Sequence, residues 1–455
     1  MDAVNKKGIS EIIDAVGGKF SKNLLLLLGI ANVFYFYNNM IISYTMSQMR
    51  SEWGLDALQT GSLTTYSLLG AMIGAASAGI IADKIGRKKT LVTAVFICGI
   101  TTLPIYFVHS YSIFAVLRVI CGLGVGACLP QVLTTISEFT PTKSRAIFVT
   151  FAMCFTALGA TTTGLVGAFI IPTYGWRIGY LIGGVPIIWA VILAFTMYES
   201  PYYLASVGRK KEALEVLYHL EKIGKGTRTE LSEDVLVLPP KPKKVGVGAL
   251  FSRNYLKTTV GLWMMYFCGA FIIYGIGAWL PSLMLEKGYA MSAAYALGLS
   301  NNVASVFSNA VTGKGSDVFG RRNNIMLGFA ASAVMFVILA NVQGSFILIF
   351  ATIFLTSFSF NYATTAVQPL APESYPTEFR GTGVSWFNGF SKFGALLAPL
   401  VAGVVIGAGA SFSTAILIFT VPSVIGIGAA FITVRTDTRG KSMDQLAAEK
   451  ELAEA

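Results

Sequence analysis

Long apolar runs constrain the fold of this chain more than any other feature of its sequence. Each run holds roughly 20 residues, enough for an α-helix to cross the ~30 Å hydrocarbon core of a bilayer. Hydrophobic residues make up 54% of the 455-residue chain and charged residues only 13%, whereas a soluble domain carries about 25% charged residues. The sequence therefore predicts an all-α integral membrane protein. Twelve transmembrane helices are predicted, at residues 22–47, 58–82, 90–108, 112–137, 145–170, 176–198, 256–284, 292–315, 323–341, 345–371, 381–407 and 411–434.

Loop charge predicts the orientation of these spans. The basic or mixed loops lie at residues 84–89, 143–145, 209–244, 314–322 and 378–380, and the nearly uncharged loops at 109–111, 341–345 and 408–411. Because an excess of Lys and Arg marks cytoplasmic loops, the N- and C-termini are both predicted to be cytoplasmic. Arg177 and Lys287 are isolated exceptions.

The longest polar stretch follows the sixth span and divides the chain into two six-helix halves. It contains a predicted surface helix, Lys210–Lys222, and a linker rich in Pro and Lys. Four regions are predicted: an N-terminal six-helix bundle at 1–198, a cytoplasmic loop at 199–255, a C-terminal six-helix bundle at 256–434 and a cytoplasmic tail at 435–455.

Composition also excludes several classes of function. The net charge of +11 is confined to short loops and forms no continuous basic face, so nucleic acid is not an expected partner. The five Cys residues lie inside apolar runs without metal-ligand spacing, which predicts small buried hydrophobes. We find no nucleophile–base set, metal cluster or phosphate-binding loop, so the sequence predicts neither an enzyme nor a bound cofactor.

One loop motif occurs twice, at matching places in the two halves. After the second span the chain carries Gly79, Asp83, Gly86 and Arg87 in the spacing G-x-x-x-D-x-x-G-R. After the eighth span the same spacing recurs with Gly313, Asp317, Gly320 and Arg321. A single copy would be a weak signal, but two copies at equivalent positions indicate that the halves are structural repeats.

With these motifs the chain resembles the major facilitator superfamily over nearly its whole length. Four further segments match that family: Arg118–Gly126, Glu138–Arg145, Glu199–Pro201 and Pro372–Gly383. The set is typical of the sugar-porter branch and its organic-acid relatives, including aromatic-acid and niacin-type permeases and synaptic-vesicle-glycoprotein-like carriers. The resemblance implies two bundles that rock about a binding site near the middle of the membrane.

Departures from the family pattern narrow the substrate class. Span seven, Tyr266–Pro281, lacks the paired Gln residues of sugar porters, and Met153 stands where those proteins carry another Gln. Sugar is therefore disfavoured, and the span-seven pattern resembles that of organic-acid carriers. Asn38 occupies the place of an Asp that many proton-coupled relatives carry in span one. This replacement makes uniport or exchange more expected than in typical relatives, while proton-coupled symport stays open.

Lys392 is the most informative single residue, because it lies near the centre of span eleven. A cation at that depth costs at least ~2.5–3.5 kcal/mol on insertion scales unless it is solvated or paired. The span interiors contain almost no Asp or Glu, which weakens the alternative of a structural ion pair. We expect Lys392 to bind the carboxylate of an anionic substrate.

Further residues are candidates for the substrate site. Arg118 in span four has two open interpretations: it binds the substrate carboxylate, or it hydrogen-bonds Asn38 and backbone carbonyls. Tyr274 and Trp386 are candidate walls of an aromatic-acid pocket, although most membrane aromatics serve packing. The remaining predicted lining residues are Asn38, Asn302, Asn361 and Asn388, each of which is also a candidate for inter-helix bonding.

The resemblance also implies a charged latch at the cytoplasmic ends of the helices. In such a latch an Asp at a helix end faces an Arg, and the contact breaks in the inward-open state. The alternative is that these charges only orient the helices in the membrane. The predicted gating residues are Asp83, Arg87, Asp317, Arg321, Glu138, Arg145, Glu373 and Arg380, with Glu199 in the same network.

These observations predict a secondary active or facilitative transporter of a small mono- or aromatic carboxylate, working by alternating access. We expect it in a bacterial inner membrane, in contact with lipid and functional as a monomer, with the proton as a candidate second partner. Three alternatives stay open, and one of them is a transporter-like receptor that no longer moves solute. A sugar or polyol carrier is disfavoured by the missing Gln residues, and an efflux carrier for organic cations by the lack of a carboxylate inside the spans.

Overall fold

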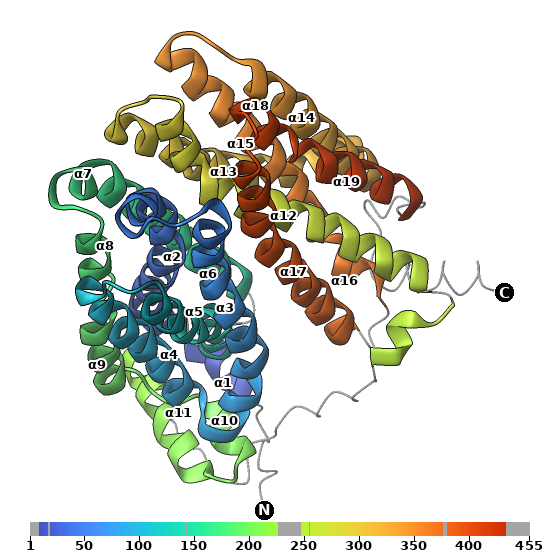
Figure 1. Ribbon diagram of the computed structural model, residues 1–455. Helices are drawn as coiled ribbons and strands as arrows, with labels where there is room; N and C mark the ends of the chain where they lie inside the picture. The colour runs from blue at the N-terminus through green and yellow to red at the C-terminus, as the bar shows by residue number, and fades with distance from the viewer. Residues whose placement is uncertain are drawn as a thin grey trace, which may run out of the picture. The chain divides into compact units, whose positions relative to one another are not determined.

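Every regular element of the computed structural model is helical in the residues that it describes, which are 9–16, 19–141, 144–225, 247–253, 255–375 and 380–433. The predicted tail at 435–455 lies outside these residues. Figure 1 labels the helices in chain order. The first half contains α1 (Ile9–Val16), α2 (Lys19–Trp53), α3 (Ala57–Ile85), α4 (Arg87–Thr102), α5 (Tyr111–Phe139), α6 (Arg145–Leu165), α7 (Ile171–Tyr174), α8 (Arg177–Ile182), α9 (Pro186–Thr196), α10 (Pro201–Ser206) and α11 (Lys210–Lys225).

The second half repeats the pattern of long helices joined by short connections. It contains α12 (Leu256–Glu286), α13 (Met291–Phe319), α14 (Arg321–Asn341), α15 (Phe346–Val367), α16 (Leu370–Ser374), α17 (Arg380–Gly407), α18 (Phe412–Leu417) and α19 (Thr420–Thr433). Short 3₁₀ turns cover Leu103–Phe107 and Val247–Phe251, and a π-helical turn covers Val166–Ile170.

Eleven helical segments of the described chain are long and apolar enough to cross a membrane. They correspond to eleven of the twelve predicted spans, which confirms the all-α membrane class. The predicted eighth span coincides with α13, which is 29 residues long but carries a polar run of Ser and Asn from Ser300 to Asn309. α13 is not among the eleven candidate spans of the described chain.

Several spans are interrupted where the sequence disfavours a regular helix. The predicted sixth span consists of α8 and α9, separated by Gly183, Gly184 and Val185. Pro186 begins α9 at its first helical position, where the missing N–H of proline breaks no helical hydrogen bond. The span is therefore continuous in hydropathy but broken in its backbone.

The chain forms two compact units. One comprises Met1–Ile41, Leu69–Val166 and Thr173–Lys241, and the other comprises Ile42–Leu68, Gly167–Pro172 and Pro242–Ala455. In the first unit α4 packs against α5 and α9, and in the second α12 packs against α17 and α19. We refer to these as the first and second units.

Glycines allow the closest helix contacts of the first unit. A Cβ on Gly74 of α3 would lie 2.2 Å from the carbonyl oxygen of Leu123 on α5. A Cβ on Gly126 of α5 would lie 1.9 Å from the carbonyl oxygen of Ala71 on α3. Because only glycine fits at these positions, the backbones of α3 and α5 touch, as is typical of close-packed membrane helices.

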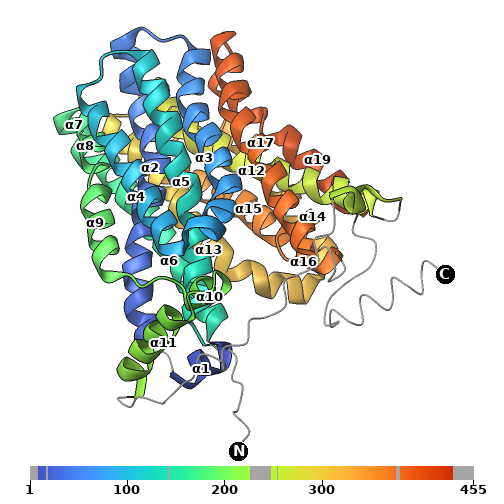
Figure 2. The ribbon, with the colours of Figure 1, turned by 90° about the horizontal axis from the view of Figure 1, so that it is seen from below.

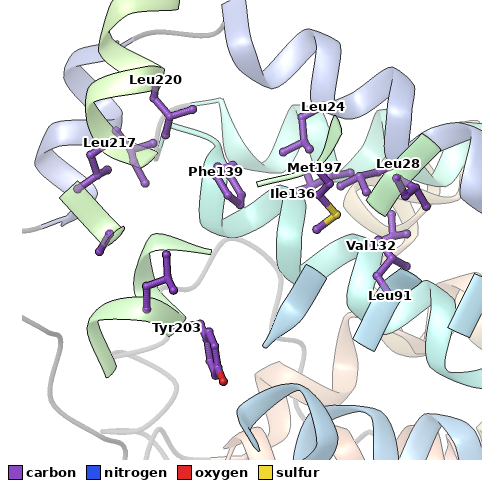
Figure 3. Packing of buried hydrophobic residues seen from close by; sticks show 14 of the residues in the cluster. Leu24, Leu28, Leu91, Val132, Ile136, Phe139, Met197, Tyr203, Leu217 and Leu220 are labelled. Carbon is purple, nitrogen blue, oxygen red and sulfur yellow. The ribbon is translucent and has the colours of Figure 1, made fainter. Parts of the chain in front are cut away.

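One end of the first unit is covered by short amphipathic helices. α1 and α11 lie beside one another there (Figure 2), and α11 begins at the residue predicted for the surface helix. Figure 3 shows the apolar packing of α11: Leu217 and Leu220 of α11 lie in one cluster with Leu24 and Leu28 of α2 and Phe139 of α5. The buried apolar faces of α1 and α11 hold them against the bundle, while Glu11 and Asp14 stay exposed.

Candidate functional site

Lys392 lies in the middle of α17, in the second unit. It follows Arg380 by 12 residues and precedes Gly407 by 15, distances of about 18 Å and 22 Å along a helix. The side chain is half-buried, and its Nζ atom lies 6.0 Å from the centre of the Tyr274 ring on α12. A cation at this distance from an aromatic face is attracted to the ring.

A second tyrosine of α12 lies near Lys392 and contacts side chains from two other helical segments. Tyr266 is close enough to Lys392 for an electrostatic interaction, and its ring stacks on Phe387 of α17 with 4.3 Å between ring centres and 7° between planes. The Nε2 atom of Gln368, at the end of α15, donates a hydrogen bond of 3.4 Å to the Tyr266 hydroxyl. We call Lys392, Tyr266, Tyr274, Phe387 and Gln368 the Lys392 cluster.

The cluster combines one cation, aromatic faces and two polar groups. None of the ion pairs in the described part of the chain includes Lys392; they join Arg50 to Glu286, Arg87 to Asp83 and Glu138, Arg209 to Glu212, and Arg321 to Glu373. The alternative of a structural ion pair therefore finds no support there. The arrangement suits a ligand with a carboxylate and an aromatic ring.

Other predicted lining residues lie apart from the cluster or bond to their own helices. Asn388 donates to the Val384 carbonyl and Asn361 to the Ser357 carbonyl, both four residues earlier. Asn302 hydrogen-bonds the side chain of Tyr44. Trp386 is 45% exposed and stacks on Trp263 at 6.0 Å, and its position lies about 120° around α17 from Lys392.

Two members of the cluster, Tyr266 and Phe387, were not singled out as site residues from the sequence, whereas Gln368 was a candidate for the lining of the cavity. Tyr266, Phe387 and Gln368 come from three different helical segments, so no spacing within one helix brings them together. The sequence offered two signals for these residues. One was the aromatic pattern of span seven, and the other was the position of Gln368 seven residues after Asn361, on the same helix face. The pairing of Tyr266 with Phe387 depends on how α12 and α17 are rotated.

Arg118 hydrogen-bonds the backbone of Asn38, as in the second of the two interpretations that the sequence left open. It is 0% exposed, and its Nη2 atom donates a hydrogen bond of 2.8 Å to the backbone oxygen of Asn38. The Asn38 amide in turn donates to the Gly183 carbonyl at 3.2 Å and accepts from the Thr102 hydroxyl at 3.0 Å. Arg118 and Asn38 thus tie α2, α4, α5 and the break before α9 into one buried polar network in the first unit.

The predicted latch residues of the first unit form a charge network around Arg87. Its Nη1 atom lies 2.8 Å from Asp83, one helical turn earlier, and its Nε atom 3.4 Å from Glu138 at the end of α5. The guanidinium also lies 5.5 Å from the centre of the Tyr203 ring. Arg87 therefore connects the ends of α3, α5 and α10.

Glu199 belongs to the same network and caps the N-terminus of α4. Its Oε1 atom accepts the backbone N–H groups of Arg87 and Lys88 at 2.8 Å and 3.1 Å. A carboxylate is favourable at a helix N-terminus, where N–H groups lack helical partners. Gly86, with φ of 102°, makes this approach possible, because a Cβ there would lie 2.1 Å from the carboxylate.

The second unit repeats this arrangement around Arg321. Gly320 has φ of 76° before α14, and Arg321 makes two hydrogen bonds to Glu373, at 2.8 Å and 3.3 Å. Gly86 and Gly320, Arg87 and Arg321 therefore occupy equivalent positions, as the repeated motif predicts. The side chains of Asp317, Arg145 and Arg380 lie outside the described residues.

Replacing Glu199 by alanine should lower the free energy of unfolding by about 1–2 kcal/mol, because two N–H groups of α4 lose their acceptor. Thermal unfolding in detergent measures the effect. Glu215→Ala is the matched control, since Glu215 is exposed on α11, and its effect should stay within about 0.5 kcal/mol. Equal effects of the two substitutions would show that Glu199 does not cap the helix.

Comparison with known proteins shows similarity along the whole chain. The profile of the Major Facilitator Superfamily matches residues 28–314 and 291–454. A 4-hydroxybenzoate transporter of Pseudomonas aeruginosa is 31% identical over 390 residues, which are 84% of this chain and 86% of that protein. A niacin transporter of Acinetobacter baylyi is 27% identical over 439 residues, 96% of this chain and 99% of that protein.

The fold is also found among solved structures. The crystal structure of a D-xylose–proton symporter superposes with a TM-score of 0.72, covering 93% of this chain and 99% of that one. The two sequences are 18% identical, so this likeness shows the shared fold alone.

Proposed function

The chain belongs to the Major Facilitator Superfamily, and from that premise we propose that it carries small aromatic carboxylates across a bacterial inner membrane by alternating access. The observation that carries this proposal is Lys392, a cation in the middle of α17 beside the Tyr274 ring at 6.0 Å. Such a group inside a membrane protein is by default a functional residue, because its burial is costly without a ligand or a partner.

In the proposed complex the substrate carboxylate binds the Lys392 ammonium. A hydrogen bond to a charged group contributes about 1.5–3 kcal/mol, and it is stronger where water is excluded. The substrate ring packs against Tyr266 and Tyr274, and the Tyr266 hydroxyl with Gln368 receives a polar substituent at the far end. The two relatives above support this class, since 4-hydroxybenzoate and niacin are both aromatic rings that bear a carboxyl group.

The remaining parts of the proposal concern gating and partners. The networks around Arg87 and Arg321 act as latches, whose charge contacts open and close with the transport cycle. Arg118 and Asn38 hold the first unit together rather than contact the substrate. One chain with two halves forms a complete transport unit surrounded by lipid, and the proton remains a candidate co-substrate without a dedicated acid in span one.

A thermal-stability screen of the purified protein tests the substrate class. A ligand at about 100 times its Kd adds roughly 2.7 kcal/mol to the free energy of unfolding. Aromatic carboxylates should stabilise the protein, whereas sugars, amino acids and organic cations should leave its Tm unchanged. Stabilisation by a sugar or a cation, with no effect of carboxylates, would contradict the proposal.

A further inference from the structure

The positive charge of Lys392 has no substrate carboxylate beside it when the carrier is empty. The ammonium lies near two tyrosines of α12, 6.0 Å from the Tyr274 ring centre and within electrostatic range of Tyr266. Aromatic faces attract a cation, but a tyrosine side chain is not a carboxylate counter-ion for it. Lys392 therefore remains a cation that its own surroundings do not neutralise.

Three carboxylates of the second unit that the structure describes are paired elsewhere or lie at helix ends. Glu286, at the end of α12, pairs with Arg50 at 2.7 Å, and Glu373 pairs with Arg321 at 2.8 Å. Asp56 caps the start of α3 by accepting the Gln59 N–H at 2.7 Å. None of these acids lies in the middle of a helix, where Lys392 is.

The sequence extends this conclusion to the whole chain. Of its 23 acidic residues, none lies in the interior of a predicted span. In the sequence, the acidic residue nearest to Lys392 is Glu378, 14 positions earlier. The interiors of the predicted spans therefore offer no carboxylate that could neutralise Lys392 when the cluster is closed to water.

We propose that this carrier works as an anion exchanger, in which the return step requires a second carboxylate on Lys392. The inference rests on the proposed function and adds the identity of the counter-substrate, another small carboxylate. With an anion bound the cluster is neutral, so its occlusion from water is cheap. Without an anion, occlusion buries an unpaired charge, which low-dielectric surroundings strongly disfavour. A ligand that binds the occluded state better than the open state shifts the conformational equilibrium towards occlusion.

One-for-one exchange of monocarboxylates also moves no net charge across the membrane. The carrier crosses neutral in both directions, with the lysine positive and the substrate negative. A uniporter of the same anion would instead move one negative charge in each cycle and respond to membrane potential. Exchange and uniport are therefore distinguishable by electrical means as well as by the need for an internal anion.

Uptake of radiolabelled 4-hydroxybenzoate into proteoliposomes tests the inference. The vesicles contain unlabelled 4-hydroxybenzoate, its neutral amide, or buffer alone. The initial rate should be about tenfold higher or more with the acid inside than with the amide or buffer. A potassium diffusion potential set with valinomycin should leave the exchange rate unchanged.

Two results would overturn exchange while leaving the proposed function intact. One is an equal initial rate with and without internal acid. The other is accumulation driven by a pH gradient in vesicles without internal anion, which would mean that Lys392 returns by releasing its proton. Absence of both 4-hydroxybenzoate binding and uptake would instead refute the proposed function.

Asn388→Asp gives an independent test, because it places a carboxylate four residues before Lys392, on the same helix face. Asn388 is exposed and donates to the Val384 carbonyl. The new carboxylate should compete with the substrate, weakening its binding about tenfold, and the remaining uptake should no longer depend on internal anion. In Asn388→Ser, which adds no charge, uptake should still depend on it. Retained dependence in Asn388→Asp, with weakened binding, would contradict the charge argument.

Discussion

Replacing Lys392 by methionine should weaken the binding of aromatic carboxylates by about 30-fold or more, because truncating one partner of a buried charge pair costs roughly 2–5 kcal/mol. Methionine keeps most of the length of the side chain, so packing against the Tyr274 ring is preserved. The protein should stay folded, and it should gain stability, since the cost of placing a cation in the middle of α17 disappears. Isothermal titration or ligand-induced change in Tm measures the affinity.

The matched control is Lys287→Met. Lys287 lies just after α12, where its Nζ donates to the Val342 carbonyl at 3.1 Å and lies 4.3 Å from the centre of the Phe412 ring. It therefore shares the chemistry of Lys392, a lysine beside an aromatic ring, but not the position in mid-helix. Its removal should leave carboxylate affinity within about twofold of the original. Similar losses in both variants would show that general charge, and not Lys392 itself, governs binding.

Replacing Gly74 by leucine should destabilise the protein by at least about 3 kcal/mol, because the new side chain has to displace the backbone of α5. A Cβ at this position would lie 2.2 Å from the carbonyl oxygen of Leu123 and 2.9 Å from its Cα. Backbone atoms inside a bundle do not move aside as the end of a flexible side chain does. The yield of monodisperse protein in detergent and its Tm should both fall.

Gly79→Leu is the control for this effect on the same helix. Gly79 lies five residues after Gly74 on α3 and is exposed, and a Cβ added to it would meet no heavy atom of another segment within 4 Å in the part of the chain that the structure describes. Leucine there should change the free energy of unfolding by less than about 1 kcal/mol. If both substitutions were tolerated equally, the close approach of α3 and α5 would not contribute to stability.

Hydropathy predicted the membrane class of the fold because apolar length is a direct physical requirement for crossing a bilayer. It did not predict the backbone breaks inside spans, such as the one at Gly183 and Gly184, because lipid tolerates such breaks where neighbouring helices supply hydrogen bonds. Here the Asn38 amide donates to the Gly183 carbonyl. That bond joins residues 145 positions apart, and no local pattern encodes it.

In the candidate site, too, some positions could be predicted from the local sequence, and others depended on how the helices pack. The mid-helix position of Lys392 could be predicted from the sequence, because it required only the depth of a charge in a span. Tyr274 followed from the pattern of span seven. The contribution of Phe387 depended on the rotation of α17 against α12, which also turned Trp386 away towards Trp263.

The repeated loop motif was predictable because it encodes backbone geometry as well as charge. Gly86 and Gly320 both adopt positive φ, at 102° and 76°, a conformation that strongly favours glycine. The Arg that follows each glycine finds a carboxylate from a different helix, Glu138 or Glu373. The family resemblance implied that these glutamates and Glu199 join one charge network, but it predicted neither these two pairs nor the capping of α4 by Glu199.

The most direct test of the central claim is saturable uptake of radiolabelled 4-hydroxybenzoate by proteoliposomes that contain an excess of internal unlabelled acid. The original protein should transport the acid, unlabelled benzoate should compete, and the neutral amide, xylose and organic cations should not. Lys392→Met should abolish this uptake, whereas Lys287→Met should retain it. Undiminished uptake by Lys392→Met, or competition by the amide as strong as by the acid, would contradict the account of Lys392 as the carboxylate site.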